Sequence, residues 1–195
     1  MLLIRGGRVI DPVREVDEIM DVMIEGSQIV ETGKALKVPA DAEVIDATGL
    51  VVAPGLMDAH VHFRDPGLTY KEDIETGFTT VVCMANTKPV VDNLETLSYV
   101  QEKGEQTPIH VLQAAAITKG LQGKELVDME ALADAGAAGF TDDGIPLMDE
   151  KLLVQAMEQA KALGLPLAFH EEDPALMSEP GVHKGKVAEQ IGYGG

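Results

Sequence analysis

From residue 49 onward, apolar runs alternate with amphipathic stretches, and this alternation constrains the possible folds more than any other feature of the sequence. Such a pattern is typical of βα units built around a parallel sheet. We expect strands at 51–57, 79–84, 109–115, 137–141 and 165–169. In barrels made of such units the loops after the strands form the reactive face, so functional residues are expected there.

Apolar stripes at helical spacing predict three helices between these strands. The first contains Leu94, Leu97 and Val100, with Asp92 as its cap, and the second contains Leu126, Met129 and Leu132. The third carries a longer stripe and is ended by Gly164, a residue type that commonly terminates helices. We interpret these stripes as core residues.

The first 48 residues have a different pattern, in which short β-type runs alternate with turn signals. Gly6-Gly7 follows one such run, and Gly26-Ser27 between two further runs predicts a hairpin. The segment contains no histidine or cysteine, so its expected role is structural. We therefore predict a small β domain over 1–48, followed by a second domain over 49–195.

The charge balance limits the possible partners. The chain has 33 acidic and 15 basic residues and a net charge of −18, which disfavours nucleic acid and anionic membranes. A small-molecule ligand is expected, and a carboxylate on that ligand would need a local cation. No apolar run has the length of a signal peptide or a membrane span, so we expect a cytoplasmic protein. The single cysteine, Cys83, lies in a predicted buried strand and is expected to be a core residue.

Polar residues follow several of the predicted strands. In a strand, residues i and i+2 point to one face, so His60 and His62 would project side by side, although an isolated pair of this kind can be purely structural. Asp142 and Asp143 follow the fourth strand, and His170 follows the fifth. Two histidines, an aspartate and a third histidine at one rim would suit a divalent metal ion.

Five segments stand out, in order along the chain: PGLMDAHVHFRDPG, KEDIETG, FTTVVCMANTKPVVDN, GFTDDG and PLAFHEED. Together they resemble dihydroorotase, a member of the amidohydrolase superfamily. The resemblance implies an α/β fold: part of a TIM-type (β/α)8 metal-dependent hydrolase barrel, preceded by part of a small β-sheet sandwich domain. It also implies the reversible cyclisation of N-carbamoyl-L-aspartate to L-dihydroorotate in pyrimidine biosynthesis. The expected cofactor is zinc, as one or two divalent ions, which would activate water and polarise the amide carbonyl.

The resemblance also assigns metal ligands. His60 and His62 match the ligands of the first barrel strand, and His170 matches the histidine that ends strand five. Where many amidohydrolases have a carbamylated lysine after strand four, this chain has aspartates, as in a group of bacterial dihydroorotases. Asp143 is the preferred ligand and Asp142 the second candidate, since Asp142 could instead cap the following turn.

Arg64 and Asn86 match the family's contacts to the substrate carboxylate. A guanidinium binds a carboxylate through two parallel hydrogen bonds and would supply the local cation. Alternatively, Arg64 could form a structural bridge to Asp65, and Asn86 could be a turn residue. His110 is expected in the core or beside the ligands, whereas His183 is expected in an exposed loop.

The sequence departs from the family pattern in two ways. A closed barrel has eight strands, but we can assign five, and the family's strand-six histidine and strand-eight proton-transferring aspartate have no counterpart. The catalytic residue is therefore unknown. A stretch after Thr76 also looks deleted, so the first barrel helix is expected to be shortened or lost. We expect the chain to be an N-terminal part, inactive alone, that aggregates, associates with further chain or belongs to a longer protein.

Two other functions stay open. The chain could come from another cyclic amidase, allantoinase or dihydropyrimidinase, although an arginine placed for a substrate carboxylate favours dihydroorotate. It could also be a non-catalytic fragment or pseudoenzyme with an assembly role. A homo-oligomer is expected, and aspartate transcarbamoylase is a candidate partner.

Overall fold

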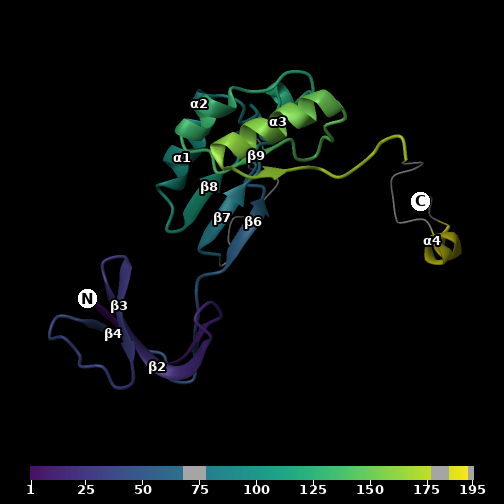
Figure 1. The fold of residues 1–195 in the computed structure, drawn as a ribbon. Helices are drawn as coiled ribbons and strands as arrows, with labels where there is room; N and C mark the ends of the chain where they lie inside the picture. Colours follow the sequence, from purple (N-terminus) through teal and green to yellow (C-terminus); the bar gives the residue numbers. More distant parts are fainter. Residues whose placement is uncertain (68–77, 177–184, 193–195) are drawn as a thin grey trace. The chain divides into compact units, whose positions relative to one another are not determined.

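The computed structural model describes residues 1–67, 78–176 and 185–192, and the chain divides into two compact units, Met1–Gly55 and Leu56–Gly195 (Figure 1). The division falls at 55/56 rather than at the expected 48/49 because Val51–Val52 pairs with a strand of the first unit. The apparent deletion after Thr76 and the expectation for His183 both fall outside the described residues.

The first unit is a five-stranded sheet with the order β3-β2-β1-β4, in which β5 also pairs with β1. β1 and β2 are antiparallel, as are β2 and β3, whereas β4 and β5 run parallel to β1. Glu25 pairs with Gln28, which confirms the hairpin predicted at Gly26-Ser27. The strands are β1 (Leu2–Asp11), β2 (Val16–Glu25), β3 (Gln28–Gly33), β4 (Glu43–Asp46) and β5 (Val51–Val52).

Gly6-Gly7 is not a turn between strands but an irregularity inside β1. The pairing register with β2 shifts between Ile4 and Gly7, and Gly6 has a φ of +70°. The Gly6 N–H donates to Asp21 Oδ1 at 2.9 Å, so a side chain of β2 satisfies the backbone group that the ladder leaves unpaired.

The strand predicted over 51–57 is wrong, because two short strands occupy this stretch. Val51–Val52 forms β5 of the first unit, and Met57 begins β6 of the second. Pro54 and Gly55 lie between them, and a proline has no N–H to continue a strand ladder.

The second unit is an α/β unit whose strands are all parallel. The sheet β6-β7-β8 is linked by a bridge between Ala115 and Phe140 to the pair β9-β10. The carboxyl ends of these strands therefore face the same edge. Four of the predicted strands are confirmed at shorter lengths: β7 (Thr80–Cys83), β8 (His110–Gln113), β9 (Phe140–Thr141) and β10 (Leu167–Ala168), beside β6 (Met57–Val61).

The three predicted helices are present, although Leu126 lies before the second one, which Asp128 caps. They lie together in Figure 1, where α2 packs against both α1 and α3, and α1 packs against β8. Asn93, not Asp92, caps α1, because its Oδ1 accepts from Thr96 N–H at 3.1 Å. Gly164 ends α3 in the left-handed conformation, as predicted. The helices are α1 (Leu94–Gly104), α2 (Met129–Asp134), α3 (Glu150–Leu163) and α4 (Lys186–Ile191), with a 3-10 turn at Lys119–Leu121.

The core of the second unit lies between these helices and the parallel strands. Leu97, Ile117, Leu132 and Phe140 are almost completely buried in it. Cys83 on β7 is also buried, which raises the pKa of its thiol to about 12. Among the described residues, no helix is both long and apolar enough to cross a membrane.

Candidate metal centre

The two histidines of the β6 segment lie at the carboxyl edge of the sheet. His60 is inside β6 and His62 directly follows it, and their ring centroids are 5.1 Å apart in an edge-to-face arrangement. The pairing of β6 with β7 is irregular between Asp58 and Val61, and His60 N–H donates to Asp58 Oδ1 at 3.0 Å. An apolar run leads into this strand and would suggest that it is buried, but Met57 is 64% exposed, because within the described residues β6 pairs only with β7.

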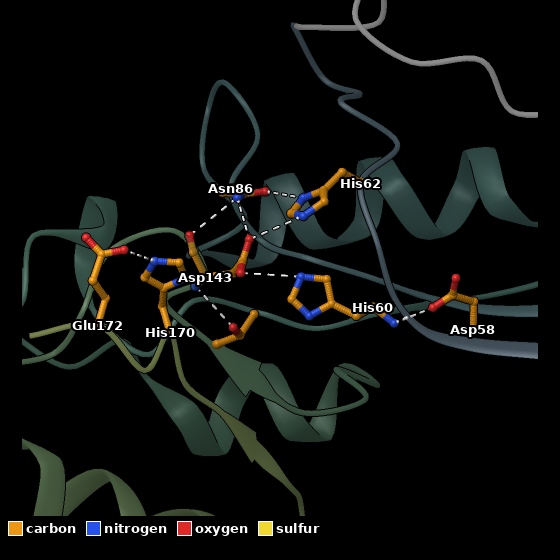
Figure 2. A network of polar contacts seen from close by, with 8 residues as sticks. Asp58, His60, His62, Asn86, Asp143, His170 and Glu172 are labelled. Carbon is orange, nitrogen blue, oxygen red and sulfur yellow. Dashed lines mark hydrogen bonds and ion pairs between the residues drawn. The ribbon is translucent and has the colours of Figure 1, made fainter. Parts of the chain in front are cut away.

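Asp143 joins these histidines from the loop after β9 (Figure 2). Its Oδ1 lies 3.3 Å from His60 Nε2, and its Oδ2 lies 3.4 Å from His62 Nε2. One ligand atom from each of the three residues lies within 4.8 Å of the other two. Two imidazole nitrogens and a carboxylate oxygen are donors that zinc accepts, and three protein ligands leave a position for water or substrate. The donor set therefore fits a divalent metal ion.

Asp142 has a different environment from its neighbour. It is 2% exposed, and its Oδ1 accepts from Ile117 N–H at 2.8 Å and Thr118 N–H at 3.0 Å, while Oδ2 accepts from the Thr118 hydroxyl. Burial raises the pKa of Asp142 despite these donors. Asp142 thus holds the segment after β8, and of the two aspartates only Asp143 belongs to the group with the histidines.

His170 follows β10 and so reaches the same edge of the sheet. Within the described residues, however, the group that could share one ion is made of His60, His62 and Asp143, and His170 lies outside it. His170 Nε2 is instead 3.1 Å from Glu172 Oε2 (Figure 2). Three of the four predicted ligands are therefore together in this structure.

Asn86 lies in the loop after β7 and contacts both ligand-bearing loops. Its Oδ1 is 2.9 Å from His62 Nδ1, and its Nδ2 donates to Asp143 Oδ2 at 2.7 Å and to the Asp143 carbonyl oxygen at 3.3 Å. Sequence reasoning assigned Asn86 to the substrate and missed these contacts. The only sequence signal for them was its place at a strand end.

Arg64 lies in the loop after β6, half-buried, with its backbone in the left-handed region at a φ of +58°. The neighbouring Asp65 is held by helix α1, through Lys103 Nζ at 2.7 Å and the Tyr99 hydroxyl at 3.2 Å. The loops after β6 and β7 approach closely, since a Cβ at Gly67 would be 2.1 Å from the Lys88 carbonyl oxygen. Arg64 and Asn86 thus come from adjoining loops.

His110 is the first residue of β8 and is exposed, so its expected place in the core or beside the ligands is wrong. The strand runs from His110 toward the site edge, which leaves this side chain at the opposite, amino end.

Comparison with protein families matches residues 49–195 to the dihydro-orotase-like family. Dihydroorotase of Clostridioides difficile is 58% identical over 203 aligned positions that cover all of this chain and 48% of the relative. Dihydroorotase of Clostridium acetobutylicum is 52% identical, covering 98% of this chain and 47% of the relative. The first alignment has more positions than the chain has residues, so the relative contains residues that this chain lacks.

Comparison with solved structures gives the fold. An L-hydantoinase from Arthrobacter aurescens has a TM-score of 0.73 at 20% identity, covering 90% of this chain and 41% of its own. A D-hydantoinase from Bacillus sp. AR9 has 0.69 at 26% identity, covering 90% and 41%. A dihydroorotase structure has 0.61 at 18% identity, covering 91% and 53%.

The chain spans about half the length of the curated relatives it matches. Their identity extends over the whole of this chain, and the matched family region includes all the residues of the candidate metal group. On this evidence the chain belongs to the dihydroorotase family.

Proposed function

We propose that this chain is the N-terminal part of a dihydroorotase, which reversibly cyclises N-carbamoyl-L-aspartate to L-dihydroorotate in pyrimidine biosynthesis. The observation that carries this proposal is the meeting of His60, His62 and Asp143 at the carboxyl edge of a parallel sheet. In the whole protein the second unit would be part of a (β/α)8 barrel, and the first unit part of a small β-sandwich domain.

His60, His62 and Asp143 would hold a zinc ion, which supplies an activated water molecule and polarises the amide carbonyl under attack. Asp143 is well suited to join the two histidines, because each of its oxygens lies near one Nε2 atom. We propose His170, which follows β10, as a further ligand, through Nδ1 if its Nε2 stays with Glu172. The proton-transferring group is not assigned to any residue of this chain.

Arg64 and Asn86 are the proposed contacts of the substrate carboxylate. The net charge of −18 would repel an anionic substrate, so a guanidinium near the metal group is needed to offset that field locally. The approach of the loops at Gly67 and Lys88 supports a common site for the two residues.

A hydantoinase or dihydropyrimidinase is the second candidate, because structures of that class share the fold with TM-scores up to 0.73 among those compared. Sequence identity favours dihydroorotase, at 58% against 26% for the D-hydantoinase. An arginine for a substrate carboxylate also favours dihydroorotate. Allantoinase is a less favoured alternative, and so is a non-catalytic role in assembly.

The proposed whole protein acts on a small molecule in the cytoplasm, as a homo-oligomer and with aspartate transcarbamoylase as a candidate partner. The relatives matched over this chain are named dihydroorotase, and this name supports a small-molecule substrate. The homo-oligomer and the binding of aspartate transcarbamoylase rest on the family resemblance alone.

Two measurements test the proposal. Zinc titration of the longer protein that contains this chain should give stoichiometric binding that His60→Ala and Asp143→Ala remove, with circular dichroism to show that both variants fold. The longer protein that contains this chain should turn over dihydroorotate in preference to hydantoin and allantoin. Preference for hydantoin would favour the second candidate, and a metal-free protein without turnover would leave only the assembly role.

A further inference from the structure

Asn86 connects two proposed ligands that come from different strands. His62 follows β6 and Asp143 follows β9, whereas Asn86 follows β7, which pairs with β6. Figure 2 shows the amide between the two side chains, with its oxygen 2.9 Å from His62 Nδ1 and its nitrogen 2.7 Å from Asp143 Oδ2. One side chain thus fixes the relative positions of both groups.

The chemistry of the amide determines the direction of each hydrogen bond. An amide nitrogen only donates and an amide oxygen only accepts, so with Nδ2 turned to the carboxylate, Oδ1 must accept from His62. His62 Nδ1 therefore carries the hydrogen, and a neutral ring has its lone pair on Nε2. That is the atom which faces Asp143 Oδ2 at 3.4 Å. In metal sites, a hydrogen bond at the far ring nitrogen commonly fixes the orientation and tautomer of a histidine ligand.

We infer that Asn86 is a positioning residue for metal binding: it holds His62 in the tautomer that ligates through Nε2, and turns the Asp143 carboxylate toward the same point. This inference rests on the proposed metal site, and it gives Asn86 a role beyond contacting a substrate carboxylate. The two roles are compatible. The longer contact of Nδ2, 3.3 Å to the Asp143 carbonyl oxygen, is the one that a substrate could replace.

The first test is zinc affinity, measured on the longer protein that contains this chain by competition with a chromogenic chelator. Asn86→Ala should weaken zinc binding about 10–100-fold, as loss of such supporting contacts to ligands does. Asn93→Ala is the matched control, because it removes the same amide from the cap of α1, away from the ligands. This control should reduce stability and leave zinc affinity within about twofold of the parent, since it removes a helix cap without touching a ligand.

The second test is spectroscopic and reads the tautomer of His62 directly. Nitrogen chemical shifts of His62 in the metal-free form of the same longer protein should show hydrogen on Nδ1, and Asn86→Ala should move the neutral ring toward the Nε2–H form. A parent protein whose neutral His62 carries its hydrogen on Nε2 and not on Nδ1 would overturn the inference. Unchanged zinc affinity in Asn86→Ala would also overturn it but spare the proposed function, provided that His62→Ala abolishes binding. A parent protein that binds no zinc would overturn both.

Discussion

The two adjacent aspartates after β9 differ in everything that surrounds them. Asp142 is buried and accepts three hydrogen bonds from Ile117 and Thr118, whereas Asp143 is directed to His60 and His62. The two side chains are chemically identical, so only their surroundings explain why Asp142 holds a loop and Asp143 can bind a metal. Asp142 directly follows β9 and Asp143 lies in the turn after it, so the two side chains reach different partners and one cannot replace the other.

Exchanging each aspartate for alanine should therefore give opposite effects. Asp142→Ala leaves two backbone N–H groups and a hydroxyl without an acceptor, and should lower the free energy of unfolding by about 1–3 kcal/mol or more. Asp143→Ala should abolish zinc binding and lower stability less. Urea denaturation and zinc titration of both variants check this. Equal effects of the two variants in both assays would contradict it.

Arg64 can be tested without changing the charge of the site. In Arg64→Lys the left-handed backbone strain at residue 64 is unchanged, but the planar guanidinium that can bind a carboxylate through two hydrogen bonds is lost. The KM for dihydroorotate should therefore rise about 10–100-fold, which corresponds to the loss of one charge-assisted hydrogen bond. Zinc content should stay the same. The measurement is steady-state kinetics on the longer protein that contains this chain. An unaltered KM would assign Arg64 a structural role and weaken the case against a hydantoinase.

At the scale of elements, side chains at the helix ends determine where each helix starts. Asp149 Oδ1 accepts from the N–H groups of Lys151 at 2.9 Å and Leu152 at 3.1 Å at the start of α3. The helix then packs Ala156 and Ala160 into the core and ends at Gly164. α3 connects β9 to β10 in the chain. The positions of its two ends therefore help to determine the positions of these strands and of the site residues that follow them.

Asp149→Ala should lower the free energy of unfolding by about 1 kcal/mol, because the first turn of α3 loses its cap. Asp149→Asn keeps the acceptor and loses only the charge near the helix N-terminus, so its cost should be a few tenths of that. Urea midpoints of the two variants and the parent measure the difference. If both variants lose the same stability, the charge and not the cap stabilises α3.

At the scale of the whole molecule, the acidic charge acts on every ligand. A net charge of −18 attracts cations and repels carboxylates over distances of about a Debye length, roughly 10 Å at 0.1 M salt. The exposed part of the metal group lies in this field, since the His60 side chain is 51% exposed.

Zinc affinity of the chain should consequently fall as salt rises, by several-fold between about 0.02 and 0.5 M sodium chloride, because screening removes the long-range attraction. Chelator competition at each salt concentration measures it, with the chelator calibrated alone at the same concentrations. Affinity that is constant or rises with salt would show that only the local ligands matter.

Local patterns predicted much of this molecule because strand alternation, helical stripes and turn residues act over a few neighbouring positions. They indicated β7 to β10, the hairpin at Gly26-Ser27, the end of α3 at Gly164, and the polar residues that follow the strands. They failed where distant segments compete for the same residues. Val51–Val52 pairs with β1 rather than with the second sheet, a choice that no local pattern encodes.

The candidate site shows the same limit. The sequence by itself indicated the three histidines and both aspartates as candidate ligands. The roles of the metal ligands and of the substrate contacts stay predictions. The resemblance already preferred Asp143 to Asp142, and the structure agrees by leaving Asp143 with the histidines. Only the tertiary structure exposed His110 at the far end of β8, set His170 beside Glu172, and put Asn86 against a carboxylate 57 residues away. The physical reason is that strand order and packing decide which loops meet, and these depend on contacts between residues far apart in the chain.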